Sequence, residues 1–238
     1  MANPRRAGTT GTPLTRGEMI GGFLYWPVYL VGLSWLLQLA FRLLGLPEDG
    51  AKLNICYFLI NFLLTAVIFR RFLIGSLSAA GHRFWAFLQA CVLGFAFYYA
   101  MLFALSFVLD WTGLSVDNPN DAAVQALAGE NYRLLLVCTI LLAPLTEETL
   151  TRGLLFGTIR PKSRFLAYAV STLVFSAIHV WQYALTDGWR VVLVSAVEYL
   201  PAGIALGWTY EKSDTIWAPV LVHGLINAVT MGLLRHVF

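Results

Sequence analysis

The sequence predicts an all-α protein, a polytopic transmembrane helical bundle. Apolar residues make up 58% of its 238 residues and charged residues only 12%, and the mean hydropathy is +0.70. An ordinary soluble domain has about a quarter charged residues and just under half apolar ones, so this composition excludes that class. The apolar runs are long and do not alternate, which argues against strands, because a lipid-exposed open sheet would leave backbone groups unpaired. Membrane-spanning helices satisfy both observations.

Seven apolar stretches are long enough to cross a bilayer. A spanning helix needs about 20 residues, because a rise of 1.5 Å per residue must cross roughly 30 Å of hydrocarbon. The first and third stretches are longer than needed, which allows tilt or a short interfacial segment. We therefore expect about seven spans, with eight as the alternative. The expected spans are 19–44, 53–69, 84–109, 134–159, 165–185, 191–210 and 216–234.

The basic residues predict that the N-terminus is cytoplasmic. Short cytoplasmic loops carry an excess of Lys and Arg. With the N-terminus inside, ten basic residues face the cytoplasm and four face the opposite side. The ten are Arg5, Arg6, Arg16, Arg70, Arg71, Arg83, Arg160, Lys162, Arg164 and Lys212, and the four are Lys52, Arg133, Arg190 and Arg235. The acidic loop 110–133 is then external.

No repeat, Pro-rich linker or low-complexity segment divides the chain, so we expect one transmembrane domain over residues 19–238 after a cytoplasmic tail, residues 1–18. The net charge of +3 is small and dispersed, which argues against a nucleic-acid partner. The three cysteines lie in apolar runs at unrelated spacings and predict neither a disulfide framework nor a CxxC metal site.

Ionisable side chains are concentrated in the last four spans. Each costs about 2.5–3.5 kcal/mol on insertion scales, and such residues usually face the bundle interior with a partner or a function. The first three spans contain no comparable cluster, with Asn54, Asn61 and Gln89 as scattered polar groups. The polar residues of the last four spans are Glu147, Glu148, Arg152, His179, Glu198, His223 and Asn227.

Four of these residues have similar predicted depths. Glu147 lies 13 residues before Arg160 and His179 lies 15 after Arg164, which is about 20 and 22 Å from the cytoplasmic flank at 1.5 Å per residue. By the same measure, His223 and Asn227 lie about 14 and 20 Å beyond Asp214. Three helices therefore bring these groups near the middle of the bilayer.

Spacing within each helix indicates separate roles. Glu148 and Arg152 form an i,i+4 pair in the favourable acidic-first order, whereas Glu147 lies about 100° around the helix without a local counter-charge. An unpaired carboxylate suits general base catalysis. His223 and Asn227 share one face. A spare carboxylate, two imidazoles and an amide can activate water and stabilise an oxyanion.

Each of these residues also has a simpler interpretation. Glu148 with Arg152 can be a structural ion pair inside the membrane. His179 alone can be a core histidine, and His223 with Asn227 can hydrogen-bond between helices. Glu198 is interpreted as structural or as lining a water-filled cavity. A proton-coupled transporter is an alternative function, although the sequence has no inverted repeat.

Three short motifs occur in order on three successive spans. Residues 147–153 read Glu-Glu-Thr-Leu-Thr-Arg-Gly, residues 175–179 read Phe-Ser-Ala-Ile-His, and residues 223–227 read His-Gly-Leu-Ile-Asn. They resemble the EExxxRG, FxxxH and HxxxN motifs of the CPBP family, the CAAX proteases and bacteriocin-processing proteins. The resemblance covers roughly residues 142–230, and Thr151 is the one departure, at a position where members often carry an aromatic residue.

The resemblance implies an intramembrane endopeptidase that hydrolyses a peptide or membrane-protein substrate in the cell (inner or plasma) membrane of a prokaryote. It implies a catalytic core at about 133–235. In this interpretation one pair activates the water, a second pair stabilises the oxyanion, and a third pair holds the geometry. The pairs are, in that order, Glu147 with His179, His223 with Asn227, and Glu148 with Arg152.

We expect no cofactor, because the sequence lacks the HExxH motif that supplies two metal ligands and a base from one helix. The alternative is Zn²⁺ held by Glu147, His179 and His223 with an open position for water. The alternative function that keeps the resemblance is a non-catalytic bacteriocin-immunity protein.

Overall fold

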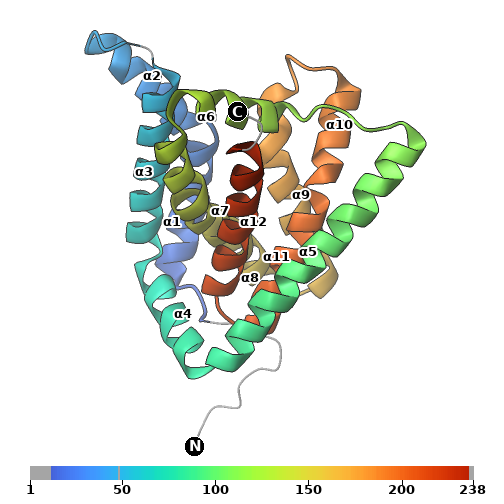
Figure 1. Ribbon diagram of the computed structural model, residues 1–238. Coiled ribbons are helices and arrows are strands. Elements are labelled where there is room, and N and C mark those ends of the chain that lie inside the picture. The colour runs from blue at the N-terminus through green and yellow to red at the C-terminus, as the bar shows by residue number, and fades with distance from the viewer. Residues whose placement is uncertain (1–11, 48, 236–238) are drawn as a thin grey trace, which may run out of the picture.

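The computed structural model describes residues 12–47 and 49–235, and every regular element in that part of the chain is a helix (Figure 1). Three of the short elements, η1 to η3, are π-helical, and η4 is a 3₁₀ turn. The elements are α1 (Arg16–Pro27), η1 (Val28–Gly32), α2 (Leu33–Leu43), α3 (Gly50–Ile68), α4 (Arg70–His82), α5 (Phe84–Thr112), α6 (Pro119–Val137), η2 (Cys138–Leu142), α7 (Ala143–Glu148), η3 (Thr149–Phe156), α8 (Gly157–Ile159), α9 (Arg164–Val180), η4 (Trp181–Tyr183), α10 (Trp189–Glu198), α11 (Leu200–Ser213) and α12 (Trp217–Arg235).

The predicted transmembrane bundle is confirmed. Six helical stretches of the described residues are long and apolar enough to cross a membrane, and a shorter apolar stretch, Trp217–Gly232, lies within α12. Together they are consistent with the predicted number of about seven spans. The six long stretches are Arg16–Leu43, Gly50–Ile68, Phe84–Thr112, Asn131–Ile159, Arg164–Tyr183 and Trp189–Ser213.

Two helices lie in segments predicted as loops, namely α4 and the first half of α6. Helix α4 connects α3 to α5, and its N-terminus is held by Glu18, whose Oε1 accepts a hydrogen bond from the Phe72 amide at 2.8 Å. An acidic side chain at a helix N-terminus satisfies a free amide and complements the helix dipole. Farther along α4, the Ser76 hydroxyl accepts a hydrogen bond from the Ile216 amide at 2.9 Å. Helix α4 therefore ties the start of α1 to the start of α12.

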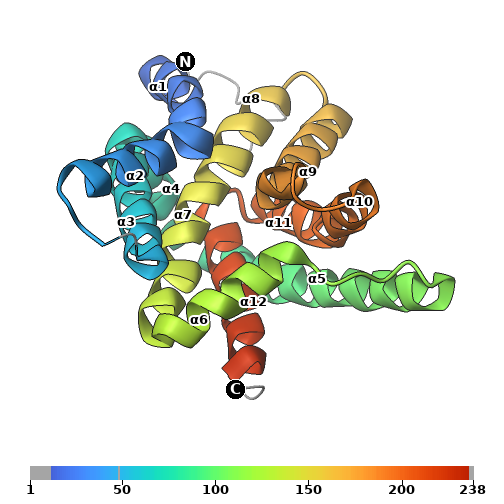
Figure 2. The same cartoon turned by 90° about the horizontal axis from the view of Figure 1, so that it is seen from above.

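The centre of the bundle is formed by α7, η3 and α12, with α3, α9 and α11 around them (Figure 2). Two glycines permit close helix contacts there. A Cβ atom at Gly224 would lie 2.6 Å from the Ile140 carbonyl oxygen, and one at Gly203 would lie 2.5 Å from a methyl carbon of Thr172. Only glycine allows α12 and α11 to approach η2 and α9 this closely.

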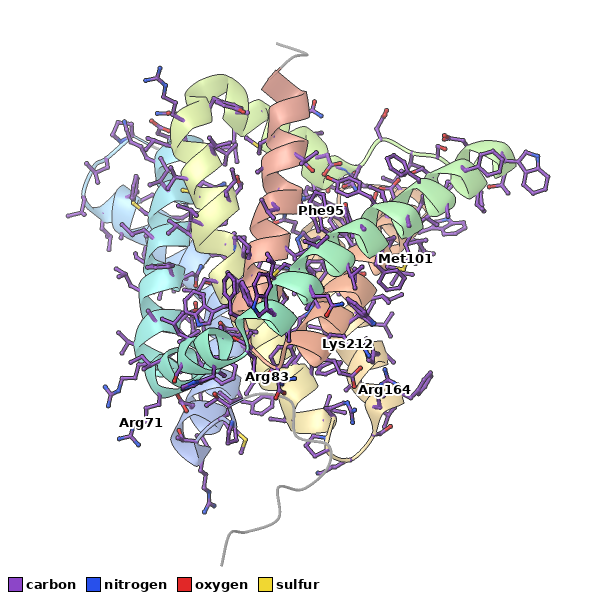
Figure 3. The ribbon with its side chains drawn as sticks, turned by 60° about the horizontal axis from the view of Figure 1, so that its bottom comes forward. Arg71, Arg83, Phe95, Met101, Arg164 and Lys212 are labelled. Atoms are coloured by element: carbon purple, nitrogen blue, oxygen red, sulfur yellow. The ribbon has the colours of Figure 1, made fainter. Side chains whose placement is uncertain are left out.

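The basic side chains predicted to be cytoplasmic gather at one end of the bundle. Arg71, Arg83 and Arg164 lie toward the end of the bundle where α4 and α8 lie (Figure 3). Arg83 and Asp214 join the start of α5 to the end of α11 there through a contact of 2.9 Å between Nη1 and Oδ2. Arg5 and Arg6 lie outside the described residues, and the cytoplasmic orientation stays a prediction.

Candidate active site

The polar residues of the fourth span lie where the helix changes its winding. Helix α7 has only six residues and lies between the π-helical segments η2 and η3. Glu147 and Glu148 end α7, and Arg152 lies in η3. A π-turn inserts a residue into a helix and so shifts the face that later side chains present, and such turns are frequent at functional sites. The local winding thus presents the motif residues to three neighbouring helices.

Glu147 lies between the two histidines, as the depth estimates predict. Its Oε2 atom is 3.7 Å from His179 Nε2 and 3.8 Å from His223 Nε2. The Glu147 and His179 side chains are 13% and 17% exposed, compared with 6% for His223. The gaps exceed a direct hydrogen bond and are of a size that a water molecule bridges. We call these three side chains the central cluster.

Glu148 and Arg152 lie behind the central cluster, out of contact with solvent. Glu148 Oε1 is 3.0 Å from Arg152 Nη1 and 2.9 Å from His223 Nδ1, and both the Glu148 and Arg152 side chains are fully buried. The predicted i,i+4 ion pair is therefore present. Arg152 Nη2 also donates to the Gly203 carbonyl at 3.0 Å, which joins η3 to α11. We call Glu148, Arg152 and His223 the buried triad.

The hydrogen bonds of the two imidazoles fix their orientation. His179 Nδ1 is 2.8 Å from the Phe175 carbonyl oxygen, and His223 Nδ1 is 2.9 Å from Glu148 Oε1. Both partners accept hydrogen bonds, so each Nδ1 is the donor and each Nε2 faces Glu147. The Phe175 ring packs between them, with its centroid 4.7 Å from that of His179 and 5.6 Å from that of His223.

Asn227 does not bond to the central cluster. Its Nδ2 donates to the Thr139 carbonyl at 2.7 Å and thereby joins α12 to η2. The structure thus brings five of the six predicted site residues into one contact network, and it places the sixth beside that network. Glu198, which the sequence analysis interpreted as structural or as lining a cavity, accepts a hydrogen bond from Asn118 Nδ2 at 2.8 Å.

A cavity of about 480 Å³ leads to Glu147 and His179. It is lined by η1 and the first half of α2, the first half of α3, α6 with η2, and the end of α9 with η4. These segments meet at the end of the bundle opposite α4 and α8 (Figure 1). The two ionisable groups of the central cluster that line this cavity are therefore the ones that a substrate can reach.

Sequence reasoning missed four side chains around this cavity. Tyr29 and Tyr57 line it, and the Tyr57 hydroxyl donates to the Tyr29 carbonyl at 2.7 Å. The Tyr199 ring stacks on His179, and Asn120 donates to the Tyr199 hydroxyl. None of the four is ionised at neutral pH or belongs to a motif. A polar aromatic group inside an apolar span was the only signal that could have identified the tyrosines.

The arrangement gives no support to a resident metal. Within the described residues, no group of three His, Cys, Asp or Glu side chains has an arrangement that could hold a metal ion. The Zn²⁺ alternative required Glu147, His179 and His223 to form such a group. We therefore derive no step through a metal.

The fold and the site define a multi-pass membrane protein with a carboxylate and two imidazoles at the end of a cavity. Residues 129–229 match the family model described as Type II CAAX prenyl endopeptidase Rce1-like. This range contains all three motifs, and the predicted resemblance is confirmed. The range 129–229 is less than half of the chain's 238 residues.

A curated relative points in the same direction. A protein of Bacillus subtilis (strain 168) named "Putative membrane peptidase YdiL" is 24% identical over 116 residues, which are 48% of this chain and 43% of that protein. The matched region thus spans less than half the length of this relative. No solved structure matches the chain. The family and the relative both support a membrane peptidase.

Proposed function

We propose that this protein is an intramembrane endopeptidase in which Glu147 activates the attacking water. The observation that carries the proposal is the convergence of two Nε2 atoms on Glu147 Oε2 at 3.7 and 3.8 Å, at the end of a cavity. A general base must lie within hydrogen-bond reach of the proton that it removes, directly or through one water. Both gaps allow a water in that position.

The proposed reaction uses the chain's own groups. Glu147 takes a proton from the water while the water oxygen bonds to the carbonyl carbon of the substrate, and His179 Nε2 orients that water. His223, in its protonated form, donates from Nε2 to the oxyanion that results. Glu147 then returns the proton to the leaving amine nitrogen as the C–N bond breaks. Donors placed in advance where charge develops act strongly in a site that excludes bulk water.

The buried triad supports the second half of this reaction. A carboxylate bonded to one ring nitrogen of a histidine sets its tautomer and its orientation. Glu148 bonds to His223 Nδ1 and also to Arg152, so the carboxylate is itself held in place. The triad therefore aims His223 Nε2 at the reaction centre. We propose that Asn227 assists the oxyanion only after exchanging its bond to Thr139.

The cavity lining favours an uncharged substrate segment. Among the residues that line it, Glu147 and His179 are accompanied by apolar, hydroxyl and carboxamide side chains, with no Lys, Arg or Asp. A charged substrate group would lose its hydration there without gaining a partner, which is costly. Gln38, Asn54 and Gln182 can instead hydrogen-bond to a peptide backbone. We propose an internal, uncharged stretch of a membrane-associated peptide or protein as the substrate.

Cleavage of a peptide pool tests the proposal. Purified wild-type protein, Glu147→Gln and His179→Ala are incubated with membrane-derived peptides, and new termini are identified by mass spectrometry. We expect cleavage by the wild type alone, with all three proteins showing the same circular dichroism. Equal cleavage by the Glu147→Gln variant would contradict the proposed role. A chelator arm is included, because loss of activity restored only by Zn²⁺ would favour the metal-dependent alternative.

The orientation has its own test. If the N-terminus is cytoplasmic, the cavity opens on the external side. Single cysteines at Arg83 and Asn54, in a protein without native cysteines, are exposed to a membrane-impermeant maleimide in intact cells. We expect labelling at position 54 only, and labelling at position 83 alone would reverse the predicted topology.

A further inference from the structure

The first half of α6 covers the cavity. Helix α6 crosses the end of the bundle opposite α4 and α8 and then turns down beside α3 (Figure 1). The turn occurs at Asn131, where φ is −155° and ψ is 75°, values outside the helical region. Asn120, Val124 and Leu127 of the crossing half line the cavity. We call residues 119–130 the α6 cover.

The α6 cover and the loop before it are tied to the far side of the cavity by side-chain hydrogen bonds. Asn118 Nδ2 donates to Glu198 Oε2 at 2.8 Å, and Asn120 Nδ2 donates to the Tyr199 hydroxyl at 2.8 Å. Both partners lie at the junction of α10 and α11. Because these bonds join segments about 80 residues apart, they hold the cover by tertiary contacts and not by its own helix.

Tyr199 also contacts the central cluster. Its ring stacks on the His179 imidazole, with the centroids 4.3 Å apart and the planes inclined by 25°. The bond from His179 Nδ1 to the Phe175 carbonyl fixes one edge of the imidazole, and the stacking fixes its face. Together the two contacts hold the imidazole in an orientation in which His179 Nε2 faces Glu147.

We propose that Tyr199 is a positioning residue for His179, and that Asn120 couples this positioning to the docking of the α6 cover. The inference rests on the proposed endopeptidase function for its catalytic consequence, but the coupling itself is a property of the fold. When the cover is docked, the Tyr199 hydroxyl has its partner and the ring lies flat on His179. When the cover lifts, the ring loses that restraint. Access of substrate and alignment of the imidazole are then linked, and the linkage is reciprocal.

Three variants test the catalytic consequence. Asn120→Ala removes the hydrogen bond to the Tyr199 hydroxyl and keeps the stacked ring. Tyr199→Phe removes the same bond together with the contact of this hydroxyl with Asp121, which also lies on the α6 cover. We expect each single variant to lower kcat by about three- to ten-fold, as for the loss of one hydrogen bond, and the double variant to lower it no further than Tyr199→Phe alone. Tyr199→Leu also removes the stacking and lowers kcat further, with KM changed less than kcat.

The matched control is Tyr132→Phe. Tyr132 lies on the second half of α6, and its hydroxyl donates to the Met231 carbonyl at 3.0 Å. This variant removes a tyrosine hydrogen bond between α6 and another helix without touching Tyr199, and we expect kcat to stay within two-fold of wild type. Additive losses in the Tyr199→Phe, Asn120→Ala double variant, or an equal loss in Tyr132→Phe, would overturn the proposal.

A labelling experiment tests the coupling without relying on catalysis. Asn54 lines the cavity and lies beside Leu127 of the α6 cover in a smaller pocket. In a protein without native cysteines, Asn54→Cys is labelled with a maleimide in detergent. We expect Tyr199→Phe and Asn120→Ala each to accelerate labelling about three- to ten-fold, as for the loss of one hydrogen bond, and Tyr132→Phe to leave it unchanged.

The two experiments distinguish failure of the proposed coupling from failure of the proposed endopeptidase function. Acceleration of labelling by both variants in a protein that cleaves no peptide would retain the cover and its coupling while rejecting the endopeptidase. Unchanged labelling in both variants would reject the coupling whatever the activity shows.

Discussion

The fourth and third spans differ strongly in how they meet their surroundings. In an apolar 18-residue stretch of Asn131–Ile159, 56% of residues are buried, compared with 11% in the equivalent stretch of Phe84–Thr112. Helix α5 presents Phe103 and Phe107 at the surface, with 68% and 70% exposure, while Glu148 and Arg152 are fully buried. One helix faces the lipid and the other is enclosed by its neighbours.

This difference explains where the chain can carry charge. An ionised group costs least within a membrane when it faces the bundle interior and has a partner. The enclosed fourth span supplies Glu147, Glu148 and Arg152, and the neighbouring α9 and α12 supply the histidines that complete their contacts. The outer helices carry no such group in contact with the central cluster among the described residues. Their role is to separate the site from lipid.

The largest expected effect comes from removing the central carboxylate. Glu147→Gln keeps the size of the side chain but cannot accept the proton of the attacking water. We expect peptidase activity to fall by about 10²- to 10⁴-fold, the usual contribution of a general base. The melting temperature in detergent should stay close to that of the wild type, because Glu147 makes no direct ion pair as short as those of the buried triad. Initial cleavage rates and a thermal melt measure the two quantities.

The buried ion pair should contribute far more to stability than an exposed one. Arg152→Met leaves Glu148 buried without its main counter-charge, and breaking such a pair costs about 3–5 kcal/mol. Arg83→Met removes an ion pair in which the arginine is 51% exposed, and exposed pairs contribute about 0.2–1 kcal/mol. Thermal melts of both variants should therefore separate clearly. Equal destabilisation would show that burial does not distinguish the two regions.

The close contact of α12 with η2 should tolerate no added methyl group. Gly224→Ala would place a Cβ atom 2.6 Å from a backbone oxygen of Ile140, and overpacking of this kind costs about 1–3 kcal/mol. Gly232→Ala is the matched control in the same helix, since no atom of another described element lies within 4 Å of its Cβ position. We expect the control to be neutral or slightly stabilising, because Ala favours a helix over Gly by about 0.8–1 kcal/mol. A lower melting temperature in both variants would contradict the packing explanation.

Much of this architecture could be predicted because its causes are local. The spans follow from length and hydropathy, and the meeting of Glu147 with His179 and His223 follows from a constant rise per residue along three helices. The pairing of Glu148 with Arg152 follows from their spacing. In each case the prediction needs only the residues of one helix, or the distance of a residue from the cytoplasmic flank of its span.

The remaining features depend on tertiary contacts that no short segment encodes. Helix α4 is too polar and too short to be a span, and it is held in place by groups distant in sequence, such as Glu18. The contact of Asn120 with Tyr199 joins residues 79 positions apart and depends on the bend at Asn131 and on the break between α10 and α11. Asn227 was predicted near the depth of the site, but its bond to Thr139 depends on how closely α12 approaches η2.

The smallest effect is expected on the lipid-facing helix, and it completes the comparison. Phe103→Leu exchanges one apolar side chain for another at a position with 68% exposure, where its ring contact is with Tyr99 of the same helix. Substitutions away from packed features usually change stability by less than about 0.5 kcal/mol. The same exchange at Phe175, which is 1% exposed and packs against both histidines, should lower stability and activity together. If the two variants behaved alike in melting and cleavage assays, shielding from lipid would not be what distinguishes the enclosed helices from the outer ones.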